Sequence, residues 1–68
     1  MQSTLTITSP DVTAKPMQLT LSAQEACDTV LWANQNLTIE AENEWLMPTR
    51  TGSFVLKLES LFRNNPVK

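Results

Sequence analysis

The sequence predicts a small α+β domain with the element order β-β-α-β-α, in which an antiparallel sheet carries helices on one face. Three observations predict it: alternation of apolar and polar residues near the N-terminus, a helix-capping sequence at Ser22, and helical spacing of apolar residues elsewhere. With 68 residues, 41% of them hydrophobic and 18% charged, the chain has the composition of one globular domain, residues 1–68. A chain of this length buries only about 60% of its unfolded surface. Self-association is therefore an expected source of stability.

The first two predicted strands form an antiparallel hairpin. Apolar residues alternate with threonines in residues 3–9 and with polar residues in residues 16–22. The connecting segment, PDVTAKP, has a proline at each end and no glycine, which predicts a loop longer than a two-residue turn. We expect polar residues to line the open face of the sheet. The residues predicted to do so are Thr4, Thr6, Thr8, Gln18, Thr20 and Thr38.

A capping box predicts the first helix. The Ser22 hydroxyl can accept a hydrogen bond from the backbone amide of Glu25, whose carboxylate can reach back to the serine amide. The helix is predicted from residue 23 to about residue 34, ended by the three-residue segment NQN, because asparagine tolerates the left-handed conformation. A third strand at residues 37–41 and an acidic turn, ENE, follow. The predicted apolar face of the helix carries Ala23, Ala26, Cys27, Val30 and Leu31, with Ala33 at its margin.

The last third of the chain fits two structures. A helix over residues 53–64 places Phe54, Val55, Leu58, Leu61 and Phe62 in one apolar stripe, and this is the preferred prediction. The alternative is a β-hairpin, in which EWLMP and SFVLKLE are strands joined by TRTG. In both structures the only glycine of the chain lets the backbone turn sharply before a regular element.

The charge is distributed unevenly. Residues 1–44 contain one lysine and six acidic residues, a balance of −5, whereas residues 45–68 contain four basic residues and one glutamate, a balance of +3. Such a split can orient two copies head to tail or offer a basic surface to an anionic partner; it can also be an ordinary solvated surface.

The sequence offers little for catalysis or metal binding. It has no histidine and no tyrosine, and Cys27 is predicted to be buried and unreactive. Glu40, Glu42 and Glu44 lack the pattern of a calcium loop and are interpreted as an acidic sheet edge. The segment PTRTGSF resembles a cap with a solvated arginine more than a phosphate site, because it lacks the second glycine and the lysine of a P-loop. No cofactor or metal is inferred.

Apolar residues in polar surroundings indicate a contact surface. Trp32 projects from the polar side of the first predicted helix, and Leu56 does the same on the last predicted helix. Trp45 either joins this surface or caps the core, and Arg50 and Lys57 are predicted to form its basic rim.

These observations favour a non-enzymatic interaction or regulatory protein that binds and modulates another protein, as a homodimer. The alternative is a small nucleic-acid-binding regulator that uses Arg50, Lys57, Arg63 and the backbone amides near Gly52, at the N-terminus of the last predicted helix, where the segment PTRTGSF could also contact a phosphate. A pI near 4.8 counts against it. No apolar run is long enough to span a membrane, and the N-terminus lacks the features of a signal peptide. A cytoplasmic location is therefore expected.

Overall fold

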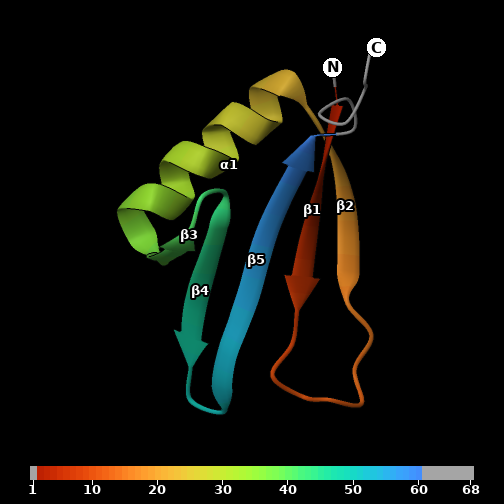
Figure 1. The fold of residues 1–68 in the computed structure, drawn as a ribbon, viewed down its shortest axis with the longest axis vertical. Helices are drawn as coiled ribbons and strands as arrows, with labels where there is room; N and C mark the ends of the chain where they lie inside the picture. Colours follow the sequence, from red (N-terminus) through yellow and green to blue (C-terminus); the bar gives the residue numbers. More distant parts are fainter. Residues whose placement is uncertain (1, 61–68) are drawn as a thin grey trace.

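The protein is a small compact α+β domain with a five-stranded antiparallel sheet and a helix (Figure 1). The computed structural model describes residues 2–60. The strands are β1 (Gln2–Thr8), β2 (Met17–Ser22), β3 (Thr38–Ala41), β4 (Glu44–Thr49) and β5 (Gly52–Ser60), and the helix α1 is Ala23–Asn36. The spatial strand order is β2-β1-β5-β4-β3, with β5 in the centre and with β2 and β3 at the edges.

The predicted N-terminal hairpin is confirmed. β1 and β2 pair antiparallel with Leu5 opposite Leu19 and Ile7 opposite Met17, so their apolar residues share one face. Thr4 lies opposite Thr20, and Thr6 lies opposite Gln18, whose Nε2 donates to the Thr6 hydroxyl at 3.4 Å. The threonine-rich face is therefore the polar face of this hairpin.

The helix begins as predicted, but it ends later than predicted and turns a different side toward the sheet. Both capping-box bonds form: the Glu25 amide donates to Ser22 Oγ at 3.2 Å, and the Ser22 amide donates to Glu25 Oε1 at 2.9 Å. The helix then continues to Asn36, and the chain leaves it in an extended conformation at Leu37, with φ −118°. The expected left-handed asparagine lies instead at Asn43, with φ 60°, in the turn between β3 and β4.

The face that α1 turns toward the sheet is centred on Ala33, which is fully buried. Leu31 and Cys27, which were predicted on that face, are exposed. The expectation of a buried thiol was therefore wrong. Alanine allows the helix backbone to approach the sheet closely, so the contact surface follows side-chain size more than hydrophobicity.

The preferred prediction of a helix at residues 53–64 was wrong, and the hairpin alternative is confirmed for the described part. β4 pairs antiparallel with β5, with Thr49 opposite Gly52 and Met47 opposite Phe54. Gly52 has φ 138°, a conformation that residues with a Cβ rarely adopt. The Thr49 hydroxyl donates to the Gly52 carbonyl at 2.6 Å and stabilises the turn. Leu61, Phe62 and Arg63 lie outside the described residues.

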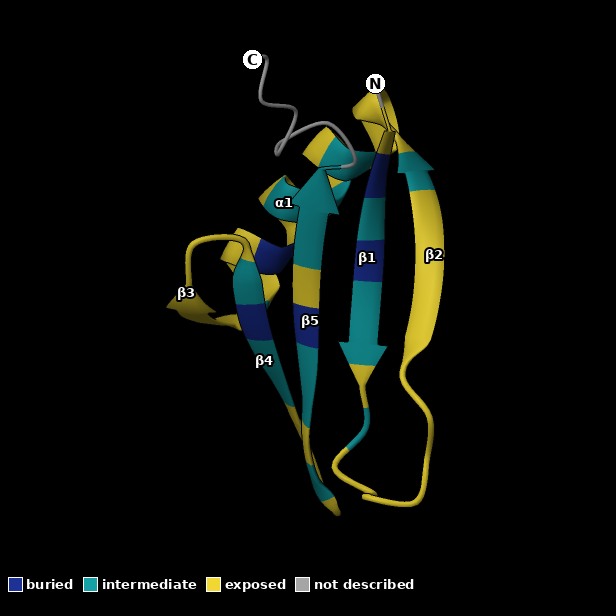
Figure 2. Ribbon diagram, turned by 45° about the vertical axis from the view of Figure 1, so that its right-hand side comes forward, coloured by how far each residue is buried: buried dark blue, intermediate teal, exposed yellow. Residues whose placement is uncertain are grey.

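The helix covers only part of the sheet. Figure 1 shows α1 crossing the sheet obliquely near the end where β1 begins and β5 ends, while the end with the β1–β2 loop and the β4–β5 turn has no helix over it within residues 2–60. The core lies beneath the helix and consists of Leu5, Ala33, Trp45 and Leu56 (Figure 2).

Candidate interaction surface

An apolar row crosses all five strands on the helix-covered face. Ile39, Trp45, Leu56, Ile7 and Met17 lie opposite one another in successive strand pairs. The middle of this row is buried, with Trp45 1% and Leu56 6% exposed, whereas Ile39 and Met17 at the two ends are 59% and 58% exposed. The row therefore carries the apolar surface of the core out to both edges of the sheet.

The predicted contact surface is not assembled in this fold. Leu56 was placed at the surface by assuming a helix, but it points into the core from β5. Trp45 is also in the core, where its Nε1 donates to Asn34 Oδ1 at 2.9 Å and ties β4 to the end of α1. Buried side chains of this kind contribute to packing and offer no surface to a partner. The partner-binding roles of Trp32, Arg50 and Lys57 stay predictions.

These three residues lie on different parts of the molecule. Trp32 is half exposed on α1, and Arg50 is exposed in the turn between β4 and β5. Lys57 lies opposite Thr6 on the polar face of the sheet and forms an ion pair with Glu59, Nζ to Oε2 3.8 Å. A single basic rim is therefore absent from the described part of the chain.

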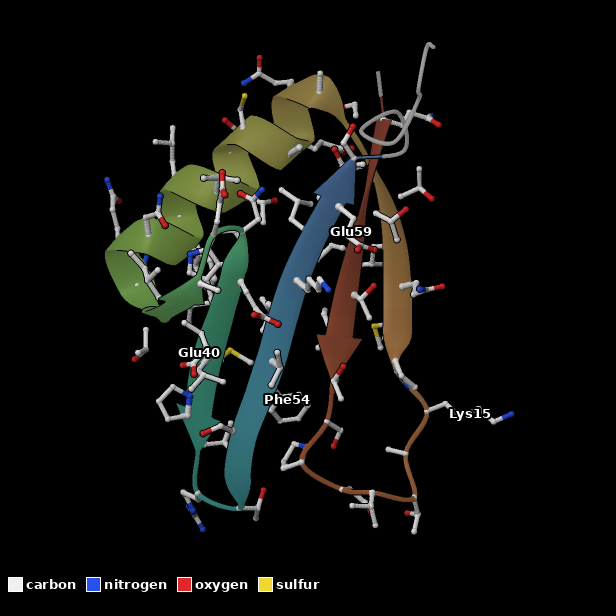
Figure 3. All side chains as sticks on the ribbon, viewed as in Figure 1. Lys15, Glu40, Phe54 and Glu59 are labelled. Atoms are coloured by element: carbon white, nitrogen blue, oxygen red, sulfur yellow. The ribbon has the colours of Figure 1, made fainter. Side chains whose placement is uncertain are left out.

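Apolar residues on the uncovered end of the sheet form a continuous surface. Phe54 on β5 lies opposite Met47 on β4, one step along from the buried row, and both are half-buried. Figure 3 shows Phe54 on the part of β5 that α1 does not cross. We call this surface the open patch, which consists of Ile7, Met17, Leu19, Met47 and Phe54.

The two flanks of α1 carry different exposed apolar residues. One flank, with Cys27 and Leu31, forms an apolar groove of about 370 Å³ with Leu58, near the end of β5. Trp32 precedes the buried Ala33 by one residue, about 100° around the helix, and lies on the flank away from Cys27. It is in the half of α1 that leads into β3, so it lies toward the β3 side of the sheet and away from the β2 edge (Figure 1).

The β2 edge adjoins the open patch and has no protection of its own. β2 is regular over six residues, contains no charge and no proline, and is exposed at almost every position (Figure 2). Leu19 in its middle is 44% exposed. An edge strand normally discourages pairing by being short, charged, bulged or covered. The sequence analysis noted the apolar alternation here but not that β2 is an edge, because strand order depends on long-range pairing.

Chemical sites are not apparent in the part of the chain that the structure describes. Among residues 2–60, no three acidic, cysteine or histidine side chains lie together in a way that could hold a metal ion. The phosphate hypothesis for PTRTGSF required a helix N-terminus, and the segment instead forms the β4–β5 turn. No helix in the described range is long and apolar enough to cross a membrane.

Comparisons with known proteins add no functional assignment. No family model matches the chain, and neither a curated protein nor a solved structure matches it. The function is therefore argued from the surface alone.

Proposed function

We propose that this chain is a non-enzymatic interaction protein that acts by binding another polypeptide at the β2 edge and the adjoining open patch. The observation that carries the proposal is the apolar row that leaves the core at Leu56 and continues through Ile7 to the exposed Met17. Apolar surface that is contiguous with a core and ends at an unprotected strand is typical of a site for strand addition.

Strand addition accounts for both parts of the surface. The backbone amides and carbonyls on the outer side of β2 can pair with an incoming extended segment, which gives affinity. The side chains of Met17 and Leu19 then contact alternate side chains of that segment, which gives specificity. Trp32, in the half of α1 that leads into β3, lies away from this edge and has no part in strand addition.

Of the two predicted rim residues, Arg50 and Lys57, only Arg50 lies near the proposed surface. Arg50 lies in the turn at the uncovered end of the sheet and can provide charge at the border of the open patch. Lys57 faces the opposite side of the sheet and has no part in the surface. The nucleic-acid alternative loses its predicted helix N-terminus, and no feature of residues 2–60 favours it.

A reducing location such as the cytoplasm is part of the proposal. Cys27 is an exposed free thiol on α1, and free exposed thiols are typical of proteins that work where disulfides do not persist.

Photo-cross-linking tests the proposal. p-Benzoylphenylalanine is placed at position 17 on β2, and a matched variant carries it at position 57 on the opposite face. The expected result is a discrete adduct with another polypeptide from position 17 and none from position 57. The adduct should disappear with Leu19→Lys and persist with Ile39→Lys, a comparable change at the other edge. Equal adducts from both faces, or an adduct that tolerates Leu19→Lys, would contradict the proposal.

A further inference from the structure

We propose that the partner at the β2 edge is a second copy of this chain, paired antiparallel through β2 so that two five-stranded sheets become one. This inference rests on the proposed function, because it names the occupant of the same edge. It follows from the pattern of β2 itself. Residues 17–21, Met-Gln-Leu-Thr-Leu, alternate apolar and polar in the same way when read in either direction.

A two-fold axis at Leu19 makes this strand complementary to itself. Each Leu19 then faces its equivalent, and Met17 faces Leu21 of the second copy, all on the helix-covered side. On the other side, Gln18 faces Thr20 of the second copy. A register shifted by one residue would place apolar residues opposite polar ones, and a shift of two residues would pair fewer apolar residues. The pattern therefore favours the register centred on Leu19.

The same register brings opposite charges together. Lys15 and Ala23 are each four residues from Leu19, so position 15 of one copy lies opposite position 23 of the other. Lys15 then lies near the first turns of the second copy's α1, which carry Glu25 and Asp28. Figure 3 shows Lys15 pointing away from the sheet, outward beyond β2. Within residues 2–60 Lys15 has no ion pair of its own.

Because the dimer is symmetric, these charge contacts occur twice. Each joins Lys15, the only lysine of residues 1–44, to acidic residues from the same segment of the second copy. A dimer of this kind should have an affinity that decreases with ionic strength but persists at high salt, since apolar contacts at Met17, Leu19 and Leu21 remain.

The opposite edge does not offer the same arrangement. β3 has four residues and an irregular register between Ile39 and Ala41, and Glu40 lies between them. Two copies paired at β3 would bring these glutamates together, which is unfavourable. The β3 edge therefore provides a matched control for the β2 edge.

Sedimentation equilibrium across a dilution series, at low and high salt, tests the inference on the full chain. The wild-type protein should be a reversible dimer. Leu19→Lys should raise the dissociation constant more than about tenfold, because it removes apolar contact and places two ammonium groups face to face. Ile39→Lys should leave it within about twofold, a change below 0.5 kcal/mol. Circular dichroism of each variant checks that the monomer is folded.

A second pair of variants keeps the test independent of how Leu19→Lys folds. Lys15→Glu changes an exposed loop residue and should weaken the dimer about tenfold at low salt and reverse its salt dependence, because salt screens the new repulsion from Glu25 and Asp28. In a Cys27→Ser background, Leu19→Cys should form an intermolecular disulfide under mild oxidation, and Ile39→Cys should not.

A monomeric wild-type protein would overturn the inference, as would a dimer that responds equally to Leu19→Lys and Ile39→Lys. Neither result alone would overturn the proposed function, which requires only that position 17 cross-links to some polypeptide in a Leu19-dependent way. Conversely, a β2-linked dimer whose adduct at position 17 contains only this chain would show that the second copy is the polypeptide bound.

Discussion

The two edges of the sheet differ in length, in regularity of register and in charge, three features that control strand pairing. β3 is four residues long, has an irregular register with β4, and is followed by the acidic turn that begins at Glu42. β2 is six residues long, pairs regularly with β1 and carries no charge. The same cross-strand apolar row reaches both edges, so exposure of apolar side chains alone does not distinguish them.

What distinguishes the edges is the access they give to the backbone. At β3 a bulge and neighbouring charges interfere with a regular ladder, so Ile39 can be exposed without inviting another strand. At β2 the backbone is regular and the side chains are compatible with an identical strand. An exposed apolar residue therefore has a different meaning at the two edges: at β3 it is tolerated, and at β2 it is the proposed docking position.

The loss of unfolding free energy caused by substitutions in the apolar row should decrease steeply from the centre of the row to the β2 edge. Trp45→Ala removes a 1% exposed indole and its hydrogen bond to Asn34, and it should reduce the free energy of unfolding by about 3–5 kcal/mol. Met17→Ala, at a 58% exposed position, should cost about 0.5 kcal/mol or less in the monomer. Urea denaturation followed by circular dichroism, at a concentration where the protein is monomeric, measures both.

The contrast between these two substitutions is the informative quantity. If Trp45→Ala leaves no folded population, Trp45→Phe keeps most of the apolar volume, loses the donor to Asn34, and should cost about 1–2 kcal/mol. A cost at Met17 similar to that at Trp45 would mean that the β2 edge is already covered within one chain. The difference between the two ends of the row would then disappear.

The sequence predicted the N-terminal half of the fold well because its signals are local. Alternation in β1 and β2 and the capping box at Ser22 each involve residues within a few positions of one another. Residues 53–60 were predicted wrongly because Phe54 and Leu58 satisfy both a helical and an alternating pattern. The outcome is decided by pairing of β5 with β1 on one side and β4 on the other, which a local pattern does not contain.

The exposure of the predicted contact residues was predicted only in part, for the same reason. Trp32 was identified correctly as exposed, since it lies among polar residues of α1. Leu56 was misplaced together with its element, and Trp45 was left undecided because its burial depends on β4 pairing with β5. The β2 edge was missed, since β2 is peripheral because β1 pairs on its other side with β5, as in Thr8 with Val55, residues far apart in the sequence.

Gly52, the only glycine of the chain, lies at the β4–β5 turn, where it approaches Pro10 of the β1–β2 loop. Its replacement should have the next largest effect on stability. A Cβ built at Gly52 would lie 2.7 Å from Pro10 Cβ, and the residue has φ 138°. Gly52→Ala should therefore reduce the free energy of unfolding by about 1–3 kcal/mol, by clash and by backbone strain. Urea denaturation of Gly52→Ala measures this cost.

A double-mutant cycle with Pro10→Gly separates the two causes. Pro10→Gly removes both proline atoms that a Cβ at position 52 would meet, so Gly52→Ala should cost less in that background. The remaining cost reports the positive φ. An unchanged cost would mean that the β1–β2 loop and the β4–β5 turn do not contact each other, and that the β2 side is connected to the centre only through β1.

The smallest expected effect concerns the loop that leads into β2. The Asp11 carboxylate accepts hydrogen bonds from the Thr13 amide at 3.0 Å and from the Thr13 hydroxyl at 2.8 Å. These bonds, the backbone one first, lower the pKa of Asp11 below its ordinary value of 3.8, because they favour the charged form. The loop is thereby held in a turn that is completed by the Ala14 amide donating to the Asp11 carbonyl at 3.0 Å.

The consequence for stability has a definite sign. Because the pKa is lower in the folded state, the stabilisation is fully present above the unfolded pKa and is lost as the pH falls through the folded value, below 3.8. An NMR titration of the carboxyl carbon should therefore show Asp11 titrating below pH 3.8. Thr13→Val should raise that pKa only partway, since the backbone donor remains. In Asp11→Asn this contribution to the pH dependence should vanish while an acceptor stays in place. An Asp11 pKa at or above 3.8 would mean that the loop is not held by these bonds, and that the regular geometry of the β2 edge is set by pairing with β1 alone.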